Sequence, residues 1–204
     1  MSVDAVVFDL GQVLVRWDPR QPFVGRMPDA DVDAFFDEVD FPTFNHHQDA
    51  GRSWAEARAW LVARFPHHVP ALDVYIEHFA DSLAGPVPGS EQVVRDLLGA
   101  GIRTLGLTNW SSETFHHAVP AAPAIGLLED VLVSGEVRLA KPDPRIFREL
   151  IDRFDLDPAR TVFTDDASRN VEAAALSGMQ AVLFTSADEL RAELRTRGIP
   201  LPPA

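Results

Sequence analysis

The sequence contains no cysteine, and only one of its 18 basic residues is lysine. Without cysteine, the chain can form neither a disulfide framework nor a zinc site with thiolate ligands. All the other basic residues are arginine. Lys141 is therefore either a lysine present by chance or a residue whose position requires an ammonium group rather than a guanidinium group. Composition alone leaves both alternatives open.

Clusters of basic residues and long apolar runs are also absent. The formal net charge is −13, and no group of lysines and arginines provides the basic face that a nucleic-acid partner requires. No apolar run approaches the roughly 18 residues of a membrane span, and the first four residues lack the basic and apolar segments of a signal peptide. We therefore expect a cytoplasmic protein without nucleic-acid or membrane partners, and make no prediction about its oligomeric state. A small anionic substrate is compatible with this charge, because a metal ion and a few cations can reverse the field inside a pocket.

Four short apolar runs predict buried strands. Helix-like segments with apolar residues on one face separate them. Strands that alternate with helices indicate an α/β fold with a doubly wound parallel sheet. The predicted strands are 3–8, 102–107, 160–163 and 180–184, and the predicted helices are 90–98, 144–154 and 168–177.

Residues 16–86 interrupt this alternation, because their apolar and aromatic residues recur at helical spacing. They predict a helical cap inserted after the first strand, with Trp54 and Trp60 in its core. The core domain then consists of residues 1–15 and 87–204, and Gly85-Pro-Val-Pro-Gly89 is the return hinge. We expect residues 198–204 to be unstructured. The pairs His67-His68 and His116-His117 lack carboxylate neighbours at metal-ligand spacing, which favours surface or packing roles.

Polar residues follow three of the predicted strands: Asp9, Thr108-Asn109 and Asp165-Asp166. In a doubly wound sheet they would face one crevice, because ligands bind beyond the carboxyl ends of the strands. Asp9 is either a nucleophile or a turn cap, and Thr108-Asn109 is either an anion site or a plain helix cap.

The remaining candidates concern charge. Adjacent Asp165 and Asp166 repel each other unless a cation is near, and hard oxygen ligands suit Mg²⁺. Asn170 follows one helical turn later and could orient a ligand. Lys141 lies before a proline that stiffens its turn, where it could neutralise a carboxylate and a phosphoryl oxygen.

In this order, these segments closely resemble the four motifs of the haloacid dehalogenase superfamily. They read Val-Val-Phe-Asp9-Leu-Gly, Leu-Thr108-Asn109, Lys141-Pro-Asp-Pro-Arg-Ile-Phe and Asp165-Asp166-Ala-Ser-Arg-Asn170. The resemblance implies a magnesium-dependent hydrolase with a Rossmann-like core, acting on a small phosphorylated substrate. It implies that Asp9 attacks phosphorus, that Thr108, Asn109 and backbone amides hold the phosphoryl oxygens, and that Lys141 offsets their charge. Asp9, Asp166 and the backbone carbonyl of Gly11 would bind Mg²⁺, with Asp165 and Asn170 in support.

Gly11 departs from the family pattern, because the phosphatases of the family carry an acid–base aspartate at this position. General acid–base catalysis contributes about 10²–10⁴-fold. Gly11 therefore predicts slow turnover, a replacement acid or a leaving group that needs little protonation. His46 and His47 in the cap are candidates for the replacement acid, and Trp17 is expected to border the pocket entrance.

Three functions remain open. The Asp-Leu-Gly form with a helical cap is similar to a bacterial branch related to the phosphatase domain of epoxide hydrolases, which includes sugar-1-phosphate phosphatases. A metal-independent 2-haloacid dehalogenase also lacks the second aspartate, but Asp165 and Asp166 would then be poorly compensated. A catalytically weak or non-catalytic member would bind a phosphorylated metabolite without turnover.

Overall fold

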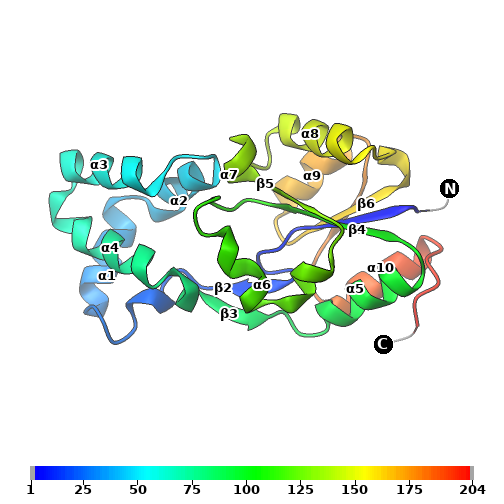
Figure 1. The fold of residues 1–204 in the computed structure, drawn as a ribbon, viewed down its shortest axis with the longest axis horizontal. Coiled ribbons are helices and arrows are strands. Elements are labelled where there is room, and N and C mark those ends of the chain that lie inside the picture. Colours follow the sequence, from blue (N-terminus) through cyan, green and yellow to red (C-terminus); the bar gives the residue numbers. More distant parts are fainter. Residues whose placement is uncertain (1–2, 203–204) are drawn as a thin grey trace.

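A sheet of five parallel strands forms the centre of the computed structural model, which describes residues 3–202 (Figure 1). The strand order is β5-β4-β1-β6-β7. Val6 of β1 lies between Thr104 on one neighbouring strand and Val162 on the other. β1 is buried on both faces, which explains its unbroken apolar sequence. The bounds are β1 Ala5–Phe8, β4 Arg103–Thr108, β5 Val131–Val133, β6 Thr161–Asp165 and β7 Gln180–Leu183.

Helices cover both faces of this sheet. α5 (Ser90–Gly99) and α10 (Ala187–Thr196) pack on one face, and α8 (Pro144–Phe154) and α9 (Ser168–Leu176) on the other (Figure 1). Alternate residues of β1 belong to two separate hydrophobic clusters, one on each face. The structure thus confirms the predicted doubly wound α/β fold.

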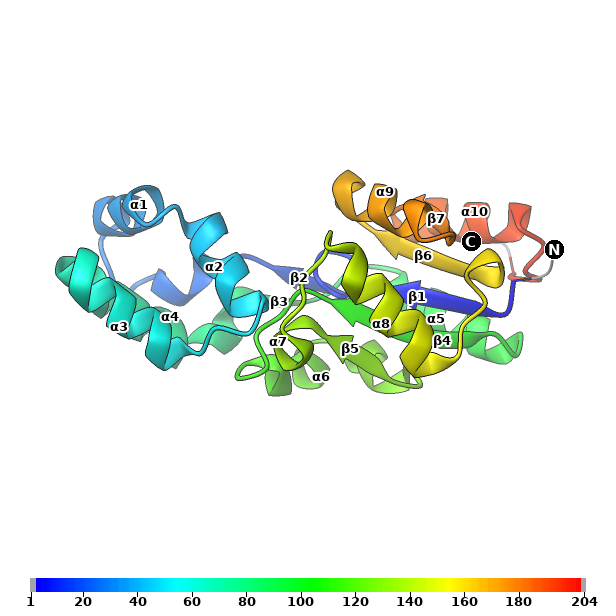
Figure 2. The same cartoon turned by 90° about the horizontal axis from the view of Figure 1, so that it is seen from above.

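Four further helices form a group at one end of the molecule, which we call the helical cap (Figure 2). They are α1 (Asp29–Glu38), α2 (Phe41–Asp49), α3 (Trp54–Arg64) and α4 (Val69–Glu77). Aromatic side chains fill the space between them, including Phe36 and Phe41 with ring centroids 4.1 Å apart. Ser53 and Glu56 form a capping box that starts α3, as the Ser-x-x-Glu spacing favours.

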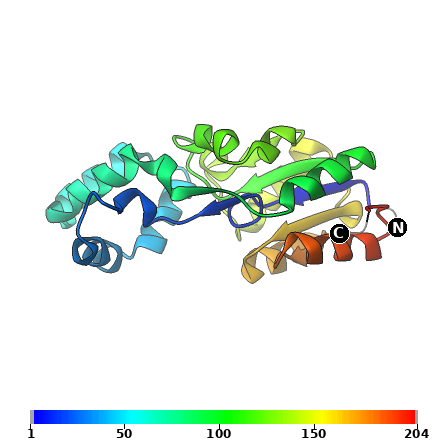
Figure 3. The same ribbon diagram turned by 90° about the horizontal axis from the view of Figure 1, so that it is seen from below.

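A two-stranded antiparallel ribbon joins the helical cap to the sheet (Figure 3). It consists of β2 (Val15–Trp17) and β3 (Leu83–Pro86). The predicted hinge at residues 85–89 therefore begins within a paired strand. β2 crosses the expected boundary between residues 15 and 16, and β3 ends at the expected boundary between residues 86 and 87. Those boundaries stay a prediction.

The end of the described chain differs from its prediction. Residues 198–202 have no regular secondary structure, but Ile199 and Leu201 are buried in the core. The Arg191 guanidinium also donates a hydrogen bond to the Pro202 carbonyl. The expectation of an unstructured end is therefore wrong for residues 198–202, and residues 203–204 lie outside the described residues.

Short elements complete the fold. The remaining helices are α6 Ala118–Ala121 and α7 Ser134–Val137, and the 3-10 helices are η1 Gln21–Phe23, η2 Pro66–His68, η3 Phe79–Ser82, η4 Phe115–His117, η5 Pro123–Leu127 and η6 Pro158–Arg160. Throughout residues 3–202, none of the helices has the length and apolar character needed to cross a membrane.

Candidate active site

Three acids meet at the carboxyl ends of β1 and β6. Asp9 follows β1 directly, Asp165 ends β6, and Asp166 comes next. The two strands are neighbours, with Phe8 paired to Thr164, so their end residues must lie side by side. One carboxylate oxygen from each acid lies within 4.8 Å of the others. Thr108 ends the adjacent strand β4 and is buried at the same edge of the sheet.

Lys141 connects two of these acids, and all three N–H groups of its ammonium are engaged. Its Nζ lies 2.8 Å from Asp9 Oδ1 and 2.6 Å from Asp165 Oδ2, and it donates a third hydrogen bond to the Leu107 carbonyl. Burial alone would lower the pKa of Lys141, but Asp9 and Asp165 raise it above its ordinary value. Three donors around one nitrogen are what an ammonium provides and a planar guanidinium does not.

Two asparagines brace the site. The Asn109 amide donates to the Lys141 carbonyl at 2.9 Å, and its Oδ1 accepts from the Lys141 backbone N–H at 2.7 Å. The Asn109 side chain is therefore engaged with the Lys141 loop. Asn170 donates to Asp165 Oδ1 at 3.0 Å. Within the part of the chain that the structure describes, the buried Asn170 Oδ1 has no hydrogen-bond partner, so it can accept a hydrogen bond from a bound water.

The charges of this site favour a cation. Three carboxylates face one ammonium. Burial raises the pKa of Asp9 to about 7, an effect that Lys141 opposes and that Asp165 and Asp166 reinforce. A divalent cation would offset the excess negative charge. Carboxylate oxygens with a nearby unpartnered amide oxygen are ligands and water acceptors that suit Mg²⁺.

A cavity lies between the helical cap and the sheet beside Gly11, and encloses about 470 Å³ together with its open mouth. Five aromatic side chains dominate its wall, from both cap and core. The Trp54 indole N–H has no partner within residues 3–202, and the Tyr75 hydroxyl faces Trp17 without meeting hydrogen-bond geometry. Both are available to polar atoms of a bound molecule. The lining residues are Gly11, Trp17, Asn45, Asp49, Trp54, Tyr75, Phe79, Asn109, Trp110, Ser111 and Thr114.

The cap residues predicted for the pocket divide into two groups. Trp17 lines the cavity. His46 and His47 are exposed on α2 and do not line it. From the same helix, Asn45 and Asp49 face the cavity instead. The sequence gives no signal for Asp49, because the face of a short helix that points to the site depends on how the cap packs against the core.

Two hydrogen bonds fasten this side of the cap to the core. Ser134 Oγ donates to the Asp49 carbonyl at 2.5 Å, and the Trp54 backbone N–H donates to Glu113 Oε1 at 2.9 Å. Ser134 Oγ also accepts a hydrogen bond from the Trp110 backbone N–H. The end of α2 is therefore held against the loop that follows β4.

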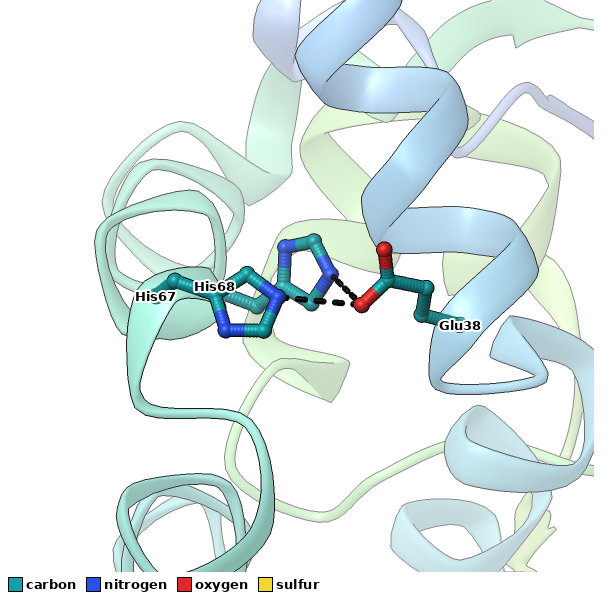
Figure 4. A group of neighbouring side chains, drawn as sticks. All are labelled: Glu38, His67 and His68. Carbon is teal, nitrogen blue, oxygen red and sulfur yellow. Dashed lines mark hydrogen bonds and ion pairs between the residues drawn. The ribbon is translucent and has the colours of Figure 1, made fainter.

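A second group of metal-ligand residue types lies within the helical cap (Figure 4). Glu38 Oε2 lies 2.9 Å from His67 Nε2 and 3.0 Å from His68 Nε2. The tertiary fold thus supplies the carboxylate neighbour that the sequence around the histidine pair lacks. Glu38 thus pairs with both histidines, and these interactions join α1 to η2.

Comparison with known proteins identifies the family of this chain. Residues 3–178 match the family model of haloacid dehalogenase-like hydrolases. The chain belongs to this family. It is similar to a haloacid dehalogenase (HAD) family enzyme from Bacteroides thetaiotaomicron, whose structure in complex with magnesium and inorganic phosphate has a TM-score of 0.72 at 19% identity and covers 91% of this chain and 96% of that one. At that identity the likeness concerns the fold.

Two fungal proteins are also similar to this haloacid dehalogenase-like hydrolase. The sesquiterpene phosphatase astK of Aspergillus oryzae is 22% identical, with 94% of each chain covered. The drimenol cyclase drtB of Aspergillus calidoustus is 25% identical over 94% of this chain, which spans only 36% of the cyclase. Phosphatases and dehalogenases are both among the similar proteins. This supports the conclusion that the chain is a hydrolase.

Proposed function

We propose that this hydrolase is a magnesium-dependent phosphatase that acts on a small phosphorylated metabolite. The observation that carries the proposal is the buried ammonium of Lys141, bonded to Asp9 and Asp165 beside the third acid, Asp166. A dehalogenase attacks carbon and needs no cation, so it would leave these acids compensated by one lysine alone. A phosphatase uses both the cation and the lysine to neutralise phosphate.

In this mechanism Asp9 attacks phosphorus in line with the leaving oxygen and forms an aspartyl-phosphate. Lys141 keeps the Asp9 carboxylate oriented, and Thr108 with backbone amides near Asn109 holds the phosphoryl oxygens. Asp9, Asp166 and the Gly11 carbonyl would hold Mg²⁺, which supplies positive charge to the phosphoryl group when bound. Asp165 fixes Lys141, and Asn170 fixes Asp165.

The cavity supports a substrate with a compact organic group. Its aromatic wall suits either an apolar group, such as a terpenoid alcohol, or a sugar ring that stacks on aromatic faces. The similarity to a sesquiterpene phosphatase supports the first, and the Asp-Leu-Gly motif supports the second. The unpartnered Trp54 and Tyr75 groups would bind a hydroxyl of either.

A substrate panel with and without EDTA tests the proposal. We expect hydrolysis of 2,4-dinitrophenyl phosphate, and of a terpenyl or sugar phosphate, only with Mg²⁺. Asp9→Asn should abolish turnover, because the nucleophile is lost. An Asp73→Asn variant is the control, since Asp73 is paired with Arg58 on the exposed surface of the cap, outside the site.

Other outcomes would point elsewhere. Halide release from a 2-haloacid that persists in EDTA would replace the phosphatase with a dehalogenase. Tight vanadate binding without turnover of any substrate would indicate a non-catalytic phosphate-binding protein. Full activity of Asp9→Asn would remove the nucleophile assignment.

A further inference from the structure

The proposed phosphatase lacks an acid at position 11, and the inference that follows rests on that proposed function. An alkoxide is a poor leaving group unless a proton reaches it as the P–O bond breaks. The replacement acid must face the space beyond Gly11, where the leaving group of a phosphorylated substrate would lie. We therefore considered every titratable side chain that lines this cavity.

Only two titratable residues line the cavity, within the chain from Val3 to Pro202: Asp49 and Tyr75. Burial raises the pKa of Tyr75 far above the range of catalytic acids. Asp49 ends α2 and lines the same cavity as Gly11. Its carboxylate accepts a hydrogen bond from Asn45, which also lines the cavity, at 3.1 Å from Oδ2.

We propose that Asp49, presented by the helical cap, is the general acid and base that replaces the side chain missing at Gly11. His46 and His47 are exposed on the same helix and do not line the cavity. Ser134 holds the Asp49 carbonyl against the core, so the end of the helix is fixed near the site.

The charge environment of Asp49 agrees with this role. Burial, reinforced by the nearby charge of Asp9 and opposed by Lys141, raises the pKa of Asp49 to about 7. An acid whose pKa lies near neutrality can both release and recover a proton during turnover. A neutral Asp49 also admits an anionic substrate without repulsion.

The proton balance is complete within the cycle. Neutral Asp49 gives its proton to the bridging oxygen as the bond from that oxygen to phosphorus breaks and the Asp9 oxygen–phosphorus bond forms. The alcohol leaves. The Asp49 carboxylate then takes a proton from the water that attacks the aspartyl-phosphate, which releases phosphate, restores the Asp9 carboxylate and returns Asp49 to its neutral form.

Leaving-group dependence tests the inference. An Asp49→Asn variant is compared with wild type on an alkyl phosphate and on 2,4-dinitrophenyl phosphate, whose leaving group needs no proton. We expect kcat/KM for the alkyl phosphate to fall about 10²–10⁴-fold, and that for the dinitrophenyl ester by less than about tenfold. This ratio reports the steps up to departure of the leaving group. Asp40→Asn is the matched control, because it makes the same change at the exposed start of α2 and should alter neither value.

Each remaining outcome decides against the inference. Equal losses on both esters, with KM raised and kcat kept, would show that Asp49 binds the substrate instead. Unchanged kcat/KM on both esters would show that another group supplies the proton. Absence of wild-type activity on the dinitrophenyl ester with Mg²⁺ would overturn the proposed function itself, which is a distinct result. Activity of the variant on that ester also shows that it is folded.

Discussion

At the scale of single residues, Gly11 is the position on which the proposed chemistry depends most. Its backbone does not have the positive φ that favours glycine, and a Cβ built there would meet no atom within 4 Å. The fold therefore does not require glycine at this point. The space beside it belongs to the cavity that Asp49 also lines.

We predict that Gly11→Asp restores alkyl-phosphate hydrolysis to the Asp49→Asn variant by at least tenfold. The new carboxyl would lie two residues after the nucleophile, facing the same leaving oxygen, and general acid catalysis offers about 10²–10⁴-fold in all. The measurement is kcat/KM for the double variant on the alkyl phosphate. Gly11→Ala in the same background is the matched control and should restore nothing. Equal rates of the aspartate and alanine variants would contradict the prediction.

Only part of the candidate site could be predicted from the sequence. The strands β1, β4 and β6 have apolar runs that can be recognised in the sequence. Their shared crevice could therefore be predicted, because it lies at their carboxyl ends, where Asp9, Thr108, Asp165 and Asp166 are found. The structure also answers the open question about Lys141, whose three contacts require an ammonium. Asp49 could not be predicted, because its place depends on contacts between α2 and Ser134, 85 residues apart in the chain.

At the scale of elements, the contact between α2, α7 and the loop after β4 positions the cap side of the cavity. Ser134 is fully buried. Its hydroxyl donates to the Asp49 carbonyl of the cap and accepts from the Trp110 backbone N–H of the core. Gly135 next to it packs so closely on the loop that a Cβ there would lie 2.6 Å from the Ser112 nitrogen. Three segments distant in sequence thus meet around one hydroxyl group.

We predict that Ser134→Ala lowers the free energy of unfolding by about 1–3 kcal/mol, because the buried Trp110 N–H loses its acceptor. The same change releases the Asp49 carbonyl and should reduce kcat/KM for an alkyl phosphate more than for a dinitrophenyl ester. Urea denaturation and steady-state kinetics measure the two effects. Ser177→Ala is the control, since the Ser177 hydroxyl bonds only within its own helix end. A stability loss no larger than the control's would contradict this account.

Other elements show where sequence periodicity stops being informative. β5 has three residues and β2 has three, too few to display a repeating pattern. In β3, half-buried and exposed residues alternate. This strand therefore has no continuous apolar run that would predict it from the sequence. Ile199 and Leu201 pack into the core from an irregular segment. We expected this segment to be unstructured because it lies at the end of the sequence.

At the scale of the whole molecule, the net charge of −13 opposes the approach of an anionic substrate. At the site itself, the buried ammonium of Lys141 and the proposed cation supply positive charge that attracts such a substrate. Charges on the outer surface act over the Debye length, which shrinks from about 30 Å at 10 mM salt to about 8 Å at 150 mM.

We predict that kcat/KM for a phosphate dianion rises several-fold as NaCl increases over this range at saturating Mg²⁺, because salt screens the repulsion. Steady-state kinetics at fixed pH measure the effect. Choline chloride at equal ionic strength should reproduce it, since screening does not depend on the identity of the cation. A steady fall of kcat/KM with salt would instead indicate attractive steering.

The burial of the one lysine side chain has a practical consequence for labelling chemistry. Acylating reagents modify amines that solvent can reach, and the arginines that carry the rest of the positive charge do not react with them. In the folded protein the ε-amine of Lys141 is 1% exposed and held by two carboxylates. Acylation at this side chain therefore requires the core to open, and the extent of its modification measures how often the buried site around Lys141 becomes accessible to solvent.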